Sequence, residues 1–325
     1  MTRDTKESDS PMRCNRFSPL AQVFMATIFL VAATRSTGYA QAGSSGFPLL
    51  KLGISGQGIA MGDAMSAYAA GAAATFYNPA GLANPVDGAK PSQLILMHKE
   101  WIQDTRTEFL AASAWLGEDD AIGVSLNSTT VSDIEIRTRP GEPEGTFTAR
   151  NFVVGVSYAR SFQSDVQLGL TGKFLYEKIL IDEASGFAVD FGLRYSTPVE
   201  RLSLGLAVSN IGQMSILRDE KTKLPALLRV GPAYTLPIEE ITSNITLASD
   251  LLYVFPEKKS YLNVGGEILL RNLVAARAGY QSGSQGRGFS AGLGIHYGIV
   301  SLDYAYTALS ADLGNTNTFS LTINL

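Results

Sequence analysis

The sequence is poor in the residue types that most often carry chemistry. It contains one cysteine, Cys14, and two histidines, His98 and His296, among 325 residues. No Lys/Arg run forms the basic stripe that a phosphate backbone requires, so we expect no nucleic-acid partner. No His, Cys and carboxylate residues have metal-ligand spacing, so we expect neither a metal nor another cofactor.

The first 42 residues have the order of a secretory signal peptide. Arg13 and Arg16 precede an uncharged apolar run over residues 18–33, and the small residues Gly38, Ala40 and Ala42 follow. We expect cleavage after residue 42 or just before it, which would also remove Cys14. An uncleaved anchor is the alternative, but the run is shorter than the roughly 20 apolar residues of a spanning helix.

Long apolar runs are missing from the rest of the chain, which instead alternates apolar and polar residues over short segments. In "TNTFSLTINL", Phe319, Leu321 and Ile323 share one face, and Ser320 and Thr322 share the other. A soluble antiparallel sandwich would alternate as well. The polar faces are rich in Gly, Ser and paired charges, and aromatic residues lie at the ends of the apolar rows. This combination favours a transmembrane barrel.

Such segments number about fourteen, an even number as in bacterial single-chain barrels. We expect strands near 92–101, 105–116, 120–137, 148–162, 164–177, 184–197, 201–210, 224–235, 241–254, 260–271, 272–281, 288–298, 299–307 and 316–325. Longer polar connections alternate with tight ones, which predicts long outer loops, short periplasmic turns and both termini on the periplasmic side. The expected fold is therefore an all-β, antiparallel outer-membrane β-barrel over residues 91–325, in a Gram-negative bacterium.

Residues 43–90 lack this alternation and are dense in Gly and Ala, which lets backbone pack closely inside a lumen. We expect them to form a hatch in the barrel. Within "AAATFYNPAGLANP", Pro79 biases Asn78 away from helix and Gly81 permits a tight bend. The candidate hatch residues are Gly58, Met61, Gly62, Phe76, Tyr77, Asn78, Pro79 and Gly81. "GQGIAMG" lacks the spacing of a dinucleotide-binding loop.

Charged and polar residues on the expected inner face include both signs on neighbouring strands. They are Lys173, Glu177, Asp190, Arg194, Glu267, Arg277, His296 and Asp303. Inward charges in a membrane normally pair, so we expect a network that fills and stiffens the barrel, with a hydrophilic conduit as the alternative. Ser290, His296 and Asp303 also permit a hydrolase triad, but Ser and Asp commonly make a lumen polar, and we expect no enzyme.

The stretch "KLGISGQGIAMGDAMSAYAAGAAATFYNPAGLA" resembles the N-terminal signature of the PorV/PorQ family, relatives of the FadL-type long-chain fatty acid transporters. In that signature a Gly-rich stretch leads to an aromatic-Asn-Pro-Ala-Gly-Leu-Ala motif. The ending "LDYAYTALSADLGNTNTFSLTINL" resembles the same family's last strands. The resemblance implies a FadL-like barrel of fourteen strands with an N-terminal hatch.

The resemblance also implies two alternative functions. The first is a docking or shuttle component for exported proteins in type IX secretion, with secreted cargo or secretion-system components as partners. The second is FadL-like transport of small hydrophobic molecules, such as long-chain fatty acids, with the ligand in the lumen. Outer-membrane lipid would surround the barrel in both cases.

Overall fold

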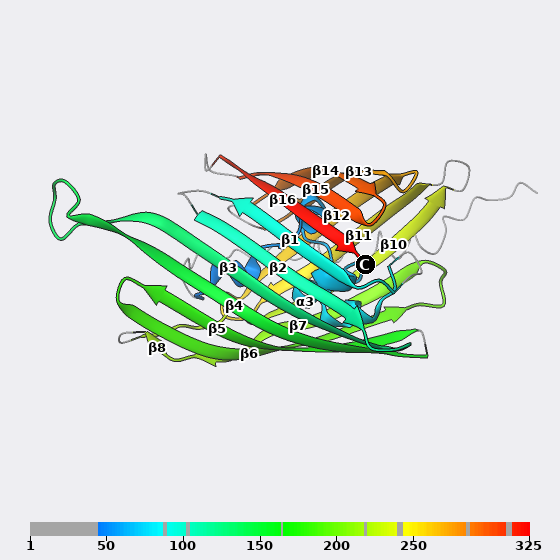
Figure 1. Cartoon of the computed structure of the whole chain (residues 1–325), viewed down its shortest axis with the longest axis horizontal. Coiled ribbons are helices and arrows are strands. Elements are labelled where there is room, and N and C mark those ends of the chain that lie inside the picture. The colour runs from blue at the N-terminus through cyan, green and yellow to red at the C-terminus, as the bar shows by residue number, and fades with distance from the viewer. Residues whose placement is uncertain are drawn as a thin grey trace, which may run out of the picture. The chain divides into compact units, whose positions relative to one another are not determined.

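The computed structural model describes residues 45–86, 90–101, 105–163, 165–217, 220–238, 243–283, 287–309 and 314–325. The expected signal peptide, residues 1–42, lies outside them. Within the described residues, fourteen antiparallel strands form a closed barrel (Figure 1). They are β1 (Gln93–Glu100), β2 (Thr105–Trp115), β3 (Asp120–Ile136), β4 (Gly145–Phe162), β5 (Val166–Ile179), β6 (Asp182–Ser196), β7 (Leu202–Met214), β10 (Leu227–Ile238), β11 (Ser243–Val254), β12 (Lys259–Leu270), β13 (Val274–Gln281), β14 (Phe289–Tyr297), β15 (Val300–Ala308) and β16 (Asn315–Asn324).

Each barrel strand pairs with its neighbours in the chain, β7 pairs with β10, and β16 pairs with β1 to close the sheet. The separate two-stranded ribbon β8 (Ile216–Leu217) and β9 (Glu220–Lys221) lies in the connection between β7 and β10. Closure leaves no unpaired sheet edge around the barrel. The expected fold class, an antiparallel barrel of fourteen strands, is confirmed.

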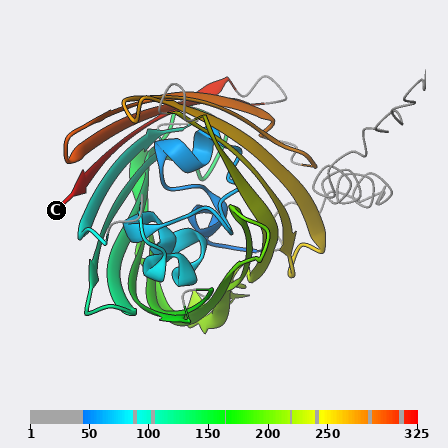
Figure 2. The ribbon, with the colours of Figure 1, turned by 90° about the vertical axis from the view of Figure 1, so that its right-hand side faces the viewer.

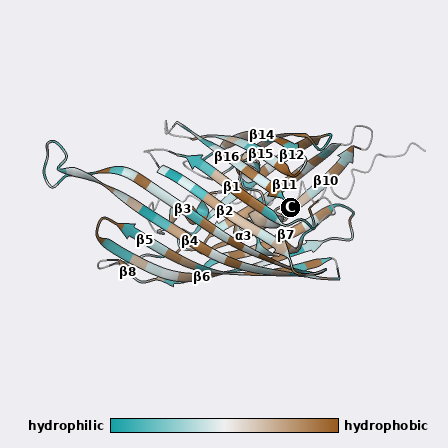
Figure 3. Cartoon of the chain, in the orientation of Figure 1, coloured by the Kyte–Doolittle hydropathy of each residue, from teal (hydrophilic) through white to brown (hydrophobic). Residues whose placement is uncertain are grey.

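The barrel wall is apolar on its outer face. On β14 and β15, Leu293 pairs with Tyr304 and Ile295 pairs with Leu302, and Leu293, Ile295 and Leu302 are exposed. Brown and white segments alternate along the strands in Figure 3, as side chains of opposite faces alternate. A soluble protein does not expose an apolar surface that surrounds it. Lipid is the environment that this surface fits.

Residues 45–86, here called the plug, lie inside the barrel (Figure 2). The plug contains η1 (Pro48–Lys51), α2 (Gly56–Ala60), η2 (Gly71–Ala73), α3 (Ala74–Tyr77) and η3 (Pro79–Ala83). Its elements are short because Gly, Pro and Asn interrupt them. The Ser55 hydroxyl accepts a hydrogen bond from the Gly58 N–H at 3.0 Å and so caps α2. Among the described residues, no helix is long and apolar enough to cross a membrane.

The plug runs along the lumen from one barrel end to the other. At the end with the longer connections, here the loop end, the Gly46 N–H donates to the Lys223 carbonyl at 2.9 Å. At the opposite end, here the turn end, the Leu325 N–H donates to the Ser92 carbonyl at 2.7 Å. The expectation that both ends of the chain lie at the turn end is therefore wrong for the first described residues. Their apolar side chains pack against the inner wall at the loop end instead.

Strands β3 and β4 extend beyond their neighbours at the loop end and form a projecting ribbon (Figure 1). Their register shifts between Val131 and Ile134, and Asp133 adopts a left-handed φ of 57° there. Ile134 then pairs with Phe147 above the shift. Such a bulge increases local twist and re-aims the strands that follow it.

Candidate functional site

The Asn-Pro-Ala-Gly turn of the plug is held by the side chain of Asn78. Its Nδ2 donates to the Ser66 carbonyl at 2.7 Å and to the Leu193 carbonyl of β6 at 3.1 Å. Its Oδ1 accepts from the Ala80 N–H at 3.2 Å, which starts η3. Asn78 is 1% exposed, so an Ala or Leu here would remove three buried hydrogen bonds. One amide side chain therefore joins two parts of the plug and the barrel wall.

Inward-facing glycines in the wall allow the plug backbone to approach closely. A Cβ on Gly192 of β6 would lie 2.1 Å from Asn78 Oδ1, and one on Gly169 of β5 would lie 2.3 Å from the Ala80 nitrogen. Across the lumen, Cβ atoms on Gly265, Gly279 and Gly292 would meet Met61, Gly62 and Ala60. Gly62 also needs its left-handed φ of 63°. A wall with side chains at these positions would not admit the plug.

Tyr77 connects the turn to the rest of the plug. Its hydroxyl donates to Asp63 Oδ1 at 2.9 Å and accepts from the Ile54 N–H at 3.2 Å. The guanidinium of Arg229 on β10 lies 5.7 Å from the ring centroid. A Cβ on Gly58 would lie 2.3 Å from the Tyr77 hydroxyl oxygen. The candidate hatch residues Gly58 and Tyr77 thus touch each other. Phe76 packs edge-to-face on Tyr77, with the ring centroids 5.2 Å apart.

Two wall residues hold the middle of the plug. Asp250 on β11 accepts from the backbone N–H groups of Met65 and Ser66, both at 2.9 Å. Arg194 on β6 donates from Nε to the Ala67 carbonyl at 3.0 Å. Sequence reasoning missed Asp250. The alternation of β11 places this carboxylate inward, but its partners are backbone groups that a sequence does not reveal.

The eight polar residues expected in the lumen all lie on the inward face, but at separate places. Lys173 and Asp190 form one pair, with 2.6 Å between Nζ and Oδ2, and Lys173 also donates to Asn210 at 2.9 Å. Glu177 lies at the loop end, where the Thr222 hydroxyl is 3.4 Å from it. Arg194 lies at the turn end and donates to the neutral side chains of Gln167, Ser196 and Ser203.

The remaining four residues form a cluster at the turn end. Arg277 pairs with Glu267 and with Asp303, the latter with 2.5 Å between Nη1 and Oδ1. His296 Nε2 lies 3.8 Å from Asp303 Oδ1. The plug joins the cluster because the Tyr68 hydroxyl donates to Glu267 at 2.6 Å. Inward-facing charges of opposite sign thus pair with one another here.

A polar cavity of 370 Å³ lies between the plug and the wall at the turn end. Arg194, Glu267, Arg277, His296 and Asp303 contribute to its lining, as do Gln57 and Tyr68 of the plug. The hydroxyl of Ser290 donates to the Ala60 carbonyl of the plug at 3.2 Å. Ser290 is thus bonded to the plug, and the described contacts bring no Ser–His pair together here. Among the described residues, no group of three or more His, Cys, Asp or Glu residues could hold a metal ion.

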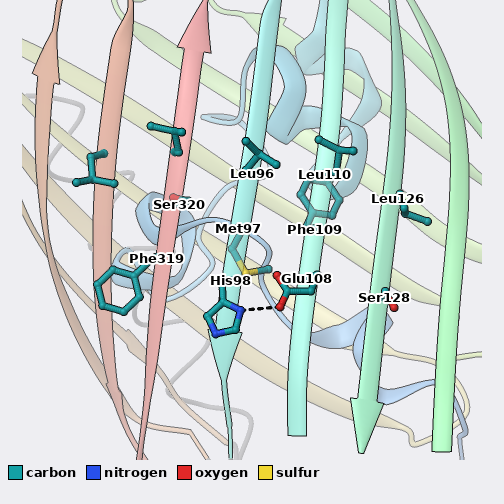
Figure 4. Close-up of a pocket in the computed structure, with 12 residues that line it drawn as sticks. Leu96, Met97, His98, Glu108, Phe109, Leu110, Leu126, Ser128, Phe319 and Ser320 are labelled. Atoms are coloured by element: carbon teal, nitrogen blue, oxygen red, sulfur yellow. Dashed lines mark hydrogen bonds and ion pairs between the residues drawn. The ribbon is translucent and has the colours of Figure 1, made fainter.

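An apolar pocket of 320 Å³ lies in the barrel wall where β1, β2, β3, β15 and β16 meet. Figure 4 shows Leu96, Leu110 and Leu126 on neighbouring strands around it, with the His98–Glu108 pair beside them. His98 Nδ1 is 2.6 Å from Glu108 Oε1. Leu96, Leu110 and Leu126 are exposed on the outer face, so the pocket opens on the lipid-facing side of the wall, and the inward-facing Met97 and Phe109 lie behind it. Phe109 in turn packs on Phe76 of the plug, with ring centroids 6.4 Å apart.

The fold is similar to that of solved outer-membrane channels. The Pseudomonas putida toluene transporter TodX superposes with a TM-score of 0.57 at 13% identity, over 83% of this chain and 96% of that one. A Pseudomonas aeruginosa FadL homologue superposes with a TM-score of 0.50 at 12% identity, over 83% of this chain and 98% of that one. At these identities the likeness shows the fold alone. No family model matches the chain, and no curated protein matches it.

The chain thus has the fold of FadL-like outer-membrane β-barrels, with a small helical plug in the lumen. The closed sheet and its apolar outer surface place it in the outer membrane of a Gram-negative bacterium.

Proposed function

We propose that this barrel transports small hydrophobic molecules across the outer membrane. The observation that carries the proposal is the apolar wall pocket, which Leu96, Leu110 and Leu126 surround on the outer face of the wall, with Met97 and Phe109 behind it. Its volume of 320 Å³ is at the lower end of the range for small-molecule sites, which suits a compact ligand. On the other side of the sheet, the ring of Phe109 packs on Phe76, next to the Asn-Pro-Ala-Gly turn of the plug.

The fold likeness supports this proposal, because the similar structures include a toluene transporter and a FadL homologue. The plug acts as the hatch in this proposal. Gly58, Met61, Gly62, Phe76, Tyr77, Asn78, Pro79 and Gly81 fix its position, and the lumenal charges keep the surrounding wall rigid.

Uptake of radiolabelled toluene by cells that lack other FadL-like channels tests the proposal. Expression of the protein should raise uptake several-fold above that of the same host with an empty vector. Leu110→Trp should fill the wall pocket and reduce uptake, whereas Leu293→Trp, which is also an outward position but does not line the pocket, should not. Folded protein is confirmed for each variant by heat-modifiable mobility. Uptake no higher than in the empty host would refute transport of this molecule class.

Docking of exported proteins, as in PorV-type type IX secretion components, is the second candidate. The projecting ribbon of β3 and β4 favours it, because residues 132–136 and 145–149 extend beyond the strands that flank them. Mild crosslinking and pull-down from a host with a type IX system tests this role. If the same secreted proteins are recovered with the intact protein and with a variant that lacks the ribbon tip, residues 137–144, the ribbon is not the docking element.

A further inference from the structure

The outer face of the barrel carries a row of cations near the loop end. Arg106 on β2, Thr130 on β3, Arg150 on β4 and Lys178 on β5 are cross-strand partners in turn, so they lie side by side on four adjacent strands (Figure 1). The alternating burial of these strands places all four side chains on the outer face. We call Arg106, Arg150 and Lys178 the cation row. Charges on the outer face of a membrane barrel need a polar environment or a partner of opposite charge.

Aromatic rings on the same face show which part of the membrane the cation row meets. Phe152 and Tyr176 are the next outward residues on β4 and β5 toward the middle of the wall, and their rings stack with centroids 5.0 Å apart. Phe174 continues the cluster toward Phe187 on β6, with ring centroids 5.4 Å apart. Aromatic side chains of barrels gather at the boundary between hydrocarbon and headgroups. Since the longer loops of such barrels face the cell exterior, the cation row lies among the headgroups of the outer leaflet.

Arg150 and Lys178 carry like charge at directly opposed positions of β4 and β5. Such a cross-strand pair destabilises a sheet unless another group compensates the charge. Lys178 has a carboxylate partner, Glu183, with 2.7 Å between Nζ and Oε1, but the two side chains are 45% and 48% exposed and such pairs contribute little. Arg150 forms no hydrogen bond or ion pair with any residue that the structure describes. An anion between the two cations would supply the missing compensation.

Arg106 also lacks a protein partner. The residue opposite it on β1 is Glu100, whose carboxylate lies 3.7 Å from His98. Arg106 itself has no ion pair within the described part of the chain. At the turn end the arrangement differs, because the outward-facing Arg160 of β4 has Asp120 at 3.6 Å. Of these outward arginines, the protein thus pairs the one at the turn end and leaves those at the loop end for a ligand.

We propose that the cation row binds the phosphate groups of lipopolysaccharide, the phosphorylated glycolipid of the outer leaflet, and holds one such lipid against β2 to β5. A guanidinium group donates two parallel N–H bonds to phosphate oxygens, and a lysine ammonium adds a point charge. Because adjacent strands are about 4.8 Å apart, Arg106 and Arg150 lie about 10 Å apart, which leaves room for separate phosphates. The row is oblique to the membrane plane because barrel strands are tilted, and the long side chains span the difference in depth.

The surface below the cation row suits the acyl chains of the same lipid. Val154, Phe174 and Phe187 form an outward cross-strand row there, and each is exposed. A free phosphate ion would leave this apolar surface uncovered, whereas a lipid covers it and neutralises the cations at the same time. The site lies on the outside of the wall, so it does not depend on the transport function.

Binding of lipid A, the phosphorylated membrane anchor of lipopolysaccharide, to the detergent-purified protein tests the site. Native mass spectrometry counts the bound lipid at each concentration. A variant with Arg106→Gln, Arg150→Gln and Lys178→Gln should bind diphosphoryl lipid A at least tenfold more weakly than the parent, because charge-assisted bonds to phosphate are lost. Arg160→Gln is the matched control and should stay within twofold of the parent. These side chains project from the outer face, so the variants should fold, which heat-modifiable mobility checks.

Glu183→Gln tests the role of Lys178 with the opposite sign. Loss of the carboxylate frees the ammonium group for phosphate, so diphosphoryl lipid A should bind at least twofold more tightly. Unchanged or weaker binding would remove Lys178 from the site.

Two other lipids test the ligand class. Lipid A with its phosphates removed should bind the parent at least tenfold more weakly, because only the acyl chains and sugars remain. Phosphatidylglycerol, an anionic phospholipid, should also bind more weakly, because it cannot reach both arginines with separate phosphates.

Each result decides between the proposal and its alternatives. Equal affinity of the parent and the folded triple variant for diphosphoryl lipid A would overturn the site. Equal binding of dephosphorylated lipid A would show that apolar contact alone holds the lipid and would refute the phosphate contacts. Phosphatidylglycerol binding as tight as that of lipid A would overturn the assignment to the outer-leaflet glycolipid.

Discussion

The two ends of the plug are both buried, but they are held by different forces. Residues 47–50 at the loop end, here called the stopper, contact the wall through apolar side chains, and their polar anchors, Ser45 and Lys51 with Glu257, lie at the flanks. The Asn78–Gly81 turn contacts wall glycines through its backbone and is hydrogen-bonded to β6. Apolar contacts are non-directional and can be replaced by those of a ligand. The close contact between the turn backbone and the wall glycines depends on the absence of a Cβ and cannot be replaced in this way. Burial alone therefore does not tell a fixed part of the plug from a movable one.

The largest effect is expected where a side chain would fill the space that the turn occupies. Gly192→Val should cost about 3 kcal/mol or more and prevent plug insertion, because its Cβ would lie 2.1 Å from Asn78 Oδ1. Gly81→Val should act in the same way from the plug side, with the Ala69 carbonyl oxygen 2.2 Å away. Gly172→Val and Gly145→Val are the respective controls, since nothing lies within 4 Å of their Cβ positions. Heat-modifiable mobility reports the folded fraction, and equal tolerance in a pair would contradict the fixed turn.

Loss of the Asn78 amide should have the next largest effect. Asn78→Ala removes the bonds of the amide to the Ser66 and Leu193 carbonyls and to the Ala80 N–H, which we expect to lower the free energy of unfolding by about 2–4 kcal/mol. The midpoint of urea unfolding measures this. Asn315→Ala, at an exposed position, should cost less than about 0.5 kcal/mol. Similar midpoints for the two variants would show that the amide does not hold the turn.

The strands were predictable because lipid and lumen impose opposite polarity on alternate residues. The expected range 241–254 compares with β11 at Ser243–Val254, and 299–307 compares with β15 at Val300–Ala308. The largest shift is at β10, expected at 224–235 and found at Leu227–Ile238. There the connection from β7 contains a ribbon of its own, and Leu224 packs in the lumen rather than in the sheet.

The plug was less predictable because its contacts are not periodic. Gly and Ala enrichment indicated a compact segment in the lumen, but no sequence feature revealed that it begins at the loop end. The packing of residues 47–50 on Leu175 and Met214 was also hidden: alternation with Lys173 and Glu177 places Leu175 on the inner face, but no sequence feature shows which part of the plug it meets. Wall residues such as Asp250 bind backbone atoms, and these carry no residue-specific signal.

Removal of the largest stopper side chain should separate local from global stability. Phe47→Ala should lower the free energy of global unfolding by less than about 1 kcal/mol, because the barrel persists without the stopper, although core Phe→Ala changes cost about 3–5 kcal/mol. Phe76→Ala, at the fixed end, should show that full cost. Urea midpoints measure both, and maleimide labelling of Leu49→Cys should accelerate in the Phe47→Ala protein alone. A loss of 3 kcal/mol or more with Phe47→Ala would make the stopper part of the barrel core.

The smallest expected effect is a pH dependence of the stopper. Burial opposes ionisation of Glu257, but Ser45 and Lys51 together hold the pKa of its carboxyl group below the ordinary value. Because this pKa is depressed, the contacts of Glu257 with Lys51 and Ser45 stabilise the stopper fully above the ordinary Glu pKa of about 4.3. This stabilisation is lost as the pH falls through the lower pKa of the folded protein. Labelling of Leu49→Cys, divided by that of the exposed Thr138→Cys at each pH, should therefore rise up to about fivefold on acidification. The ratio corrects for thiol ionisation. Glu257→Gln should give the raised ratio already at pH 7 and abolish the dependence, and a flat profile in the parent protein would show that Lys51 and Glu257 do not restrain the stopper.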